Sequence, residues 1–224
     1  MLGTLRLPLI ILLAPSATSA AGTNIGISAA SAAAGSVRHA REDRVSWPVV
    51  GWMLPPSVAG AFLGAYFGSE LSEQALLGVA AGILVFNGID LLVRPFHARP
   101  RTRLRIAPAI AGGLGVGALG GAIGVILGTM RMPVLLRGVG MTAAKAVGTN
   151  LVVGFAVGAV GLAGHAARLE VEWELLAVGA PAAVAGGWFG AKLTGRLSEL
   201  TLRRAIGAAL IVIAAALAVE AALR

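Results

Sequence analysis

Apolar stretches separated by short polar loops run along nearly the whole chain. A helix needs about 20 apolar residues to cross the hydrocarbon core of a bilayer, and these stretches have roughly that length. The pattern therefore predicts an all-α polytopic membrane protein with about 7–8 transmembrane helices. The expected segments are a half-segment at 7–14 and spans at 17–37, 47–68, 73–93, 107–127, 143–163, 175–193 and 205–222.

The second half of the chain repeats the order of the first. Residues 22–73 align without a gap with residues 148–199, at an offset of 126, and 19 of these 52 positions are identical. The identities include His39/His165, Trp47/Trp173, Pro55/Pro181 and Glu73/Glu199. We therefore predict two homologous four-segment repeats, residues 1–93 and 107–224, joined by a basic connector at 94–106. Repeats of four true spans would be parallel, whereas a re-entrant first segment would make them inverted.

Each half begins with the same short motif. Leu2-Gly3-Thr4, Arg6 and Pro8 match Leu127-Gly128-Thr129, Arg131 and Pro133 at an offset of 125. A glycine-rich run at 107–126 precedes the second copy, and we expect it to form a helix-packing face. Only Met1 precedes the first copy, so the first repeat is predicted to be truncated by about 20 residues. Residues 1–21 also resemble a cleavable signal peptide, but the internal copy of the motif favours a membrane segment.

Composition agrees with a membrane location. Hydrophobic residues make up 57% of the chain and charged residues 12%, whereas soluble domains carry about 25% charge. The net charge is +8, but aromatic residues are few and the cations lie in short loops, which favours an orientation signal over nucleic-acid binding. The connector alone holds five arginines, so its side of the membrane is predicted to be cytoplasmic. The absence of cysteine excludes disulfides and thiolate catalysis.

The two motif arginines are the first candidates for function. Arg6 and Arg131 are flanked by apolar residues, and an ionisable group at membrane depth is costly enough to suggest a function. Pro8 and Pro133 break helical hydrogen bonding beside them. Broken segments in matching positions of two repeats point to a transporter binding site. The alternative is that both arginines extend to the lipid headgroups.

A Thr-Asn pair opens the next span of each half. The pairs Thr23-Asn24 and Thr149-Asn150 each follow a glycine, where they can cap a helix or help to bind an anion. The sharper hypothesis is that these four residues converge with the arginines on one substrate site. Capping without a ligand is the alternative.

The remaining polar residues carry weaker signals. His39 and His165 lie at helix ends and are interpreted as structural, because no partner stands at metal-ligand spacing. Glu73 and Glu199 follow serines at span starts and are interpreted as helix caps. We therefore expect neither a metal nor a cofactor.

The pattern resembles the sulfite exporter TauE/SafE family, also called the toluenesulfonate uptake permease family. The resemblance rests on the glycine-rich run before Pro133, the sequence Ala-Val-Gly-Thr-Asn at 146–150, and the spans at 55–71 and 181–197 with their spaced prolines and glycines. It covers nearly the whole chain, but Gly-Thr-Leu-Arg and Gly-Thr-Met-Arg replace the run of glycines that family members often carry before the proline. The resemblance implies a multi-pass transporter of sulfur-containing anions such as sulfite or sulfonates.

The combined expectation is a secondary transporter of small anions in contact with the lipid bilayer. An unrelated organic anion is an alternative substrate, and a non-transporting membrane scaffold is an alternative class. A membrane enzyme would need a clustered acid, base or metal set, which the sequence does not show. The coupling ion (a proton or sodium), the direction of transport and the oligomeric state stay open.

Overall fold

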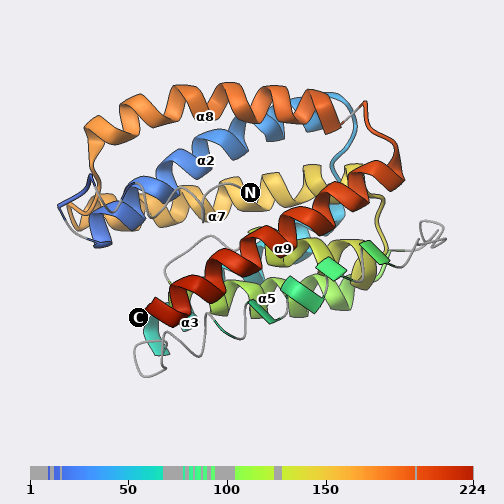
Figure 1. Cartoon of the computed structure of the whole chain (residues 1–224), viewed down its shortest axis with the longest axis horizontal. Coiled ribbons are helices and arrows are strands. Elements are labelled where there is room, and N and C mark those ends of the chain that lie inside the picture. Colours follow the sequence, from blue (N-terminus) through green and yellow to red (C-terminus); the bar gives the residue numbers. More distant parts are fainter. Residues whose placement is uncertain are drawn as a thin grey trace.

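The computed structural model describes residues 10, 13–15 and 17–67, scattered positions between 78 and 93, and residues 104–123, 128–194 and 196–223. The described residues form helices and contain no strand. The elements are α2 (Ala17–Arg41), α3 (Trp47–Phe67), α5 (Ile106–Ile123), α6 (Gly128–Pro133), the π-helical segment η2 (Val134–Val139), α7 (Ala143–Ala167), α8 (Trp173–Thr194) and α9 (Glu199–Leu223) (Figure 1).

The observed helices lie close to the predicted spans, with two informative differences. α9 begins at Glu199 and not near 205, because the Ser198 hydroxyl accepts a hydrogen bond from the Thr201 amide at 3.1 Å and caps the helix. The predicted span 107–127 is α5 only to Ile123, and a separate short helix, α6, begins at Gly128. The predicted half-segment 7–14 and span 73–93 lie largely outside the described residues.

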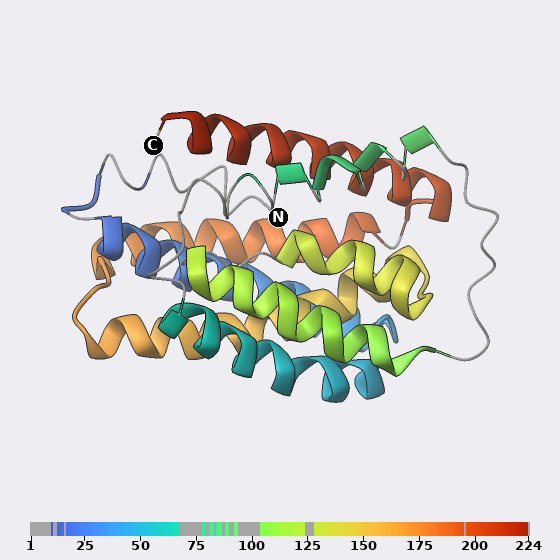
Figure 2. The same cartoon turned by 90° about the horizontal axis from the view of Figure 1, so that it is seen from below.

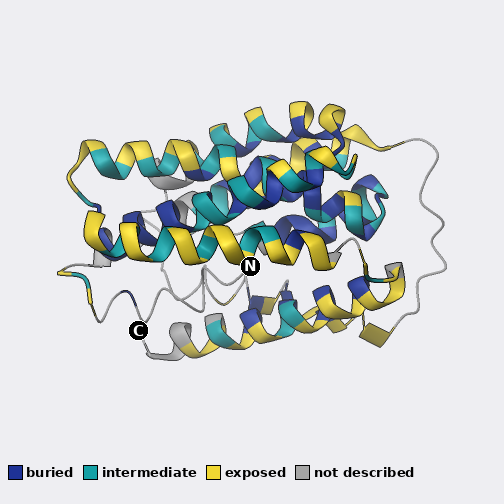
Figure 3. Cartoon of the chain, turned by 90° about the horizontal axis from the view of Figure 1, so that it is seen from above, coloured by how far each residue is buried: buried dark blue, intermediate teal, exposed yellow. Residues whose placement is uncertain are grey.

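Two described helices, Ala143–Ala167 and Trp173–Leu193, are long and apolar enough to cross a membrane, and Ile106–Gly120 is a shorter apolar helix. Large apolar side chains are exposed on several helices, among them Trp52, Phe62, Val178 and Phe189. Figure 3 shows exposed residues on the outward sides of the helices and most of the buried residues toward the middle of the bundle. Exposed apolar faces of this extent are typical of helices that contact lipid.

Helices α2 and α7 pack against each other in antiparallel orientation. A Cβ added to Gly22 would lie 2.9 Å from the Cβ of His165, and one added to Gly148 would lie 3.0 Å from the Cβ of His39. The start of each helix therefore contacts the end of the other. These four positions are related pairwise by the offset of 126, so the two contacts are reciprocal. Reciprocal contacts between antiparallel helices are what an approximate two-fold axis produces, and the relation of the two halves as inverted or parallel repeats stays a prediction.

The loops after α2 and α7 share one backbone conformation. Asp43 and Leu169, also 126 residues apart, have φ values of 53° and 59° and are the only non-glycine residues with positive φ in the part of the chain that the structure describes. The Arg44 amide donates to the His39 carbonyl at 2.8 Å, and the Glu170 amide donates to the His165 carbonyl at 2.9 Å. The matched backbone agrees with the predicted duplication.

Helices α3 and α5 form a second close pair (Figure 2). A Cβ added to Gly60 would overlap the carbonyl oxygen of Leu114, and one added to Gly117 would overlap the carbonyl oxygen of Ser57. Glycines therefore allow the two backbones to touch. The helix-packing role predicted for the glycine-rich run is confirmed at Gly113 and Gly117.

The contact between α2 and α7 yields a first prediction. Gly148→Ala places a methyl group where the Arg44 carbonyl oxygen and the His39 side chain already lie, so the helix ends must separate. We expect the free energy of unfolding to fall by about 1–3 kcal/mol, since overpacking costs that much in well-packed interiors. Thermal unfolding in detergent measures it. Gly164→Ala is the matched control, because an added Cβ there meets nothing within 4 Å. Equal melting temperatures for the two variants would contradict the close contact.

Candidate functional site

The only charged motif residue that the structure describes is deeply buried. Arg131 lies in α6 and is 2% exposed, which makes it the largest of the fully buried side chains among the described residues. Its neighbours Met130 and Met132 are also buried, so α6 lies inside the protein and not at its edge. The described residues around Arg131 therefore keep its guanidinium away from the lipid headgroups.

Helix α6 passes directly into η2 at Pro133, which lacks an amide hydrogen. The segment ends at Gly140, whose φ of 87° is readily adopted only by glycine, and the amide of Met141 donates to the Leu135 carbonyl at 3.0 Å. Wide helical turns of this kind are frequent at functional sites. Helix α6 thus continues into the wider turns of η2 at Pro133, and the predicted break of the segment at this proline stays a prediction.

Two helices converge on the Arg131 guanidinium. A Cβ added to Gly128 of α6 or to Gly154 of α7 would lie 3.9 Å from Nη1 of Arg131. The Gly128 position also lies beside the Asn150 side chain, at 3.5 Å from its amide nitrogen. Arg131 and Asn150 thus share one small region, and the two glycines leave room for a methyl group on each side of the guanidinium.

The polar atoms in this region lack partners. Nε and Nη1 of Arg131 and Oδ1 of Asn150 are buried and have no hydrogen-bond partner among the described residues. An uncompensated buried charge costs several kcal/mol, and buried polar groups are nearly always hydrogen-bonded. A bound anion would satisfy the guanidinium, and a rotated Asn150 amide could donate to the same anion. We call Arg131, Asn150, Gly128 and Gly154 the Arg131 site.

The two threonines bind backbone at opposite ends of the α2–α7 pair. The Thr149 hydroxyl oxygen accepts from the Ser46 amide at 3.0 Å, just before α3, and the Thr23 hydroxyl oxygen accepts from the Glu172 amide at 2.8 Å, just before α8. Each threonine therefore supports the start of a helix in the other half of the chain.

This geometry separates residues that the sharper hypothesis brought together. Gly148, next to Thr149, lies against His39, and α2 extends roughly 24 Å from Thr23 to His39 at 1.5 Å per residue. Thr23 and Asn24 thus do not converge with Thr149 and Asn150, because the helices that carry them are antiparallel. Arg6 and Pro8 lie outside the described residues.

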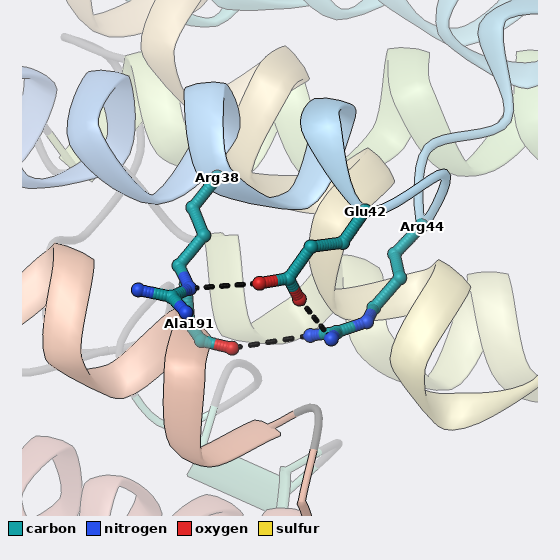
Figure 4. A network of polar contacts seen from close by, with 4 residues as sticks. All are labelled: Arg38, Glu42, Arg44 and Ala191. Carbon is teal, nitrogen blue, oxygen red and sulfur yellow. Dashed lines mark hydrogen bonds and ion pairs between the residues drawn. The ribbon is translucent and has the colours of Figure 1, made fainter.

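A charged network joins α2 to α8 (Figure 4). It lies in the region between the expected spans 17–37 and 47–68, which the sequence predicts to be a polar loop. Glu42 accepts from Arg38 Nε at 2.9 Å and forms an ion pair with Arg44. Nη1 of Arg44 donates to the Ala191 carbonyl at 3.2 Å, and the Arg38 guanidinium lies 5.1 Å from the centre of the Trp188 ring. The spacing of Arg38 and Glu42, four residues apart on a helix, is the signal that could have revealed it.

One family of known proteins matches most of this chain. The family described as Sulfite exporter TauE/SafE matches residues 2–217. The chain belongs to the TauE/SafE family. This confirms the resemblance found in the sequence and makes the protein a member of a membrane transporter family.

A curated relative agrees with the TauE/SafE assignment. The chain is 23% identical over 194 residues to the "Probable membrane transporter protein YdhB" of Bacillus subtilis (strain 168), an alignment that covers 84% of this chain and 79% of the relative. No solved structure matches the chain.

The support that Thr149 gives to α3 can be tested. Thr149→Val keeps the shape of the side chain but leaves the buried Ser46 amide without its acceptor, which we expect to cost about 1–2 kcal/mol. Thr149→Ser retains the hydroxyl and should lose less. Thermal unfolding of both variants measures the difference. A Val variant as stable as the Ser variant would show that the hydrogen bond contributes nothing.

Proposed function

We propose that this TauE/SafE protein is a multi-pass secondary transporter of small anions in the bacterial inner membrane, and that the Arg131 site binds the anion. The single observation that carries the proposal is the buried guanidinium of Arg131, with two of its nitrogens unpaired among the described residues. An unpaired buried charge destabilises the folded protein, and an anionic ligand would supply the compensating negative charge.

The chemistry of the site favours a compact oxoanion. The guanidinium presents its donors as a planar fork that matches the oxygens of a sulfite, sulfonate or carboxylate group. One arginine neutralises one negative charge. A methyl group added at Gly128 or Gly154 would make only ordinary van der Waals contacts, so the space beside each glycine can hold a group of that size. The description of the family as sulfite exporters supports sulfite or a small sulfonate among these candidates.

Two alternatives fit the observations less well. A membrane scaffold has no use for an unpaired buried cation, and the description of the Bacillus relative as a probable transporter favours transport. An enzyme would need an acid, base or metal beside the anion, and the described residues assigned to the Arg131 site, Asn150, Gly128 and Gly154, supply none of these. Transport without chemical change of the anion is therefore the function that these residues support best.

Removal of the buried charge tests the site. Arg131→Gln should reduce sulfite flux into proteoliposomes by about 100-fold at low substrate concentration, since charge-assisted hydrogen bonds of this kind contribute roughly 2–3 kcal/mol. Arg131→Lys keeps the charge but not the fork and should fall between. Arg204→Gln, which removes an exposed arginine of α9, is the matched control for net charge. Wild-type flux in Arg131→Gln would remove this residue from the site.

The space beside the Arg131 guanidinium predicts that substrate size matters. Gly154→Ala adds a methyl group 3.9 Å from Nη1 of Arg131 without a steric clash and with better helix propensity, so the fold should be retained. We expect the KM for methanesulfonate to rise about 10-fold more than the KM for sulfite, the usual effect of one methyl group in a close-fitting site. Gly164→Ala controls for the helix. An equal change for both anions would contradict a role in size selection.

A further inference from the structure

His39 is a buried polar side chain without an assigned role. It lies in the last turn of α2, is 0% exposed, and neither ring nitrogen has a hydrogen-bond partner among the described residues. A buried polar atom without a partner is rare enough in proteins to require an explanation. The interpretation of His39 as a structural residue at the interface does not supply one, since the ring makes no hydrogen bond in the described part of the chain.

The equivalent histidine in the second half has a partner. His165 Nδ1 lies 2.9 Å from Oε2 of Glu170, and the pair is partly exposed. The residue equivalent to Glu170 in the first half is Arg44. The two loops share the positive φ and the hydrogen bond to the histidine carbonyl, so the equivalent positions present different side chains on a similar backbone. An arginine therefore stands near His39 where a carboxylate stands near His165.

Burial, together with the neighbouring arginines, favours a neutral His39 ring while the Arg131 site is empty. Arg38 and Arg44 lie close by, and the one nearby carboxylate, Glu42, is already bound to both of them. On the α7 side, His39 lies against Gly148, and the nearest charged residue along that helix, Lys145, is exposed. A proton on His39 would therefore add positive charge to a buried region that already carries a net excess of it.

The Arg131 site lies within electrostatic reach of this ring. His39 packs on Gly148, and Nη1 of Arg131 lies beside Gly154, which is roughly 9 Å further along α7 at 1.5 Å per residue. Two opposite charges about 10 Å apart in a protein interior change a proton equilibrium by on the order of one pH unit. The arrival of an anion at Arg131 is therefore enough to favour protonation of His39.

We propose that His39 is a proton-binding site coupled to the Arg131 site, so that an anion and a proton are bound together and cross the membrane together. This inference rests on the proposed function, and it names the coupling ion as the proton. Linkage is reciprocal, because an anion that favours the proton on His39 is itself bound more tightly when that proton is present. The proton comes from the aqueous solution on one side and returns to the solution on the other.

The titration of the histidines tests the coupling directly. The chain has three histidines, so ¹³C-labelled histidine gives a simple NMR spectrum of the purified protein in detergent, and His39→Gln assigns the His39 signal. Arg131→Gln removes a positive charge near the ring and should raise the titration midpoint of His39 by about one pH unit. His165, at the opposite end of α2–α7, serves as the internal control and should keep its midpoint. Equal His39 midpoints in the wild type and Arg131→Gln would overturn the coupling.

Addition of methanesulfonate separates this inference from the proposed function. The probe keeps one negative charge throughout the titration, and it should raise the His39 midpoint in the wild type but not in Arg131→Gln. A midpoint that responds to Arg131→Gln but not to methanesulfonate would support the coupling and count against this anion as a ligand of the site.

Transport measurements supply the second test. In proteoliposomes that contain a pH-sensitive dye, methanesulfonate movement through the wild type should move protons in the same direction. His39→Gln should still move the anion but lose the proton movement, whereas the matched variant His165→Gln should keep both. Proton movement that persists in His39→Gln would overturn the assignment.

Discussion

Direct contact between backbones at two glycines is the constraint on which the described arrangement depends. Gly22 and Gly148 allow the ends of α2 and α7 to lie against each other, and any side chain at either position would force them apart. The same contact fixes where Thr23 and Thr149 reach the other half of the chain. It also brings His39 to the turn of α7 that precedes Asn150. Packing of the helices and the geometry of the site therefore have one origin.

The helical spans could be predicted because their signal is local. A run of apolar residues of bilayer length predicts α7 and α8 to within four residues at each end. The sequence placed the start of α9 near 205 and the cap at Glu199, whereas the Ser198 hydroxyl caps the helix. The relative direction of α2 and α7 could not be predicted, since no local pattern in either helix encodes how the two pack. The structure resolves residues 128–139 into α6 and η2, and the contacts between the ends of α2 and α7 show that these two helices are antiparallel.

The candidate site was predictable in its residue types but not in its grouping. Arg131 and Asn150 stood out as polar residues in apolar surroundings, and the structure brings them together. Thr149 stood out for the same reason, yet its hydroxyl oxygen accepts a backbone hydrogen bond from Ser46, a contact across 103 positions that no local pattern encodes. The Arg38–Glu42–Arg44 network was not predicted from the sequence, because charged residues in a loop are usually solvated.

The loops after α2 and α7 share a backbone but not a chemistry. In a dimer of identical subunits, a residue introduced at one end appears at the other end as well, because symmetry copies it. Here the equivalent positions belong to one chain, so Arg44 and Glu170 differ while the fold around them is the same. A single chain with two similar halves can thus place different charges at the two ends of the α2–α7 pair, which a symmetric dimer cannot do.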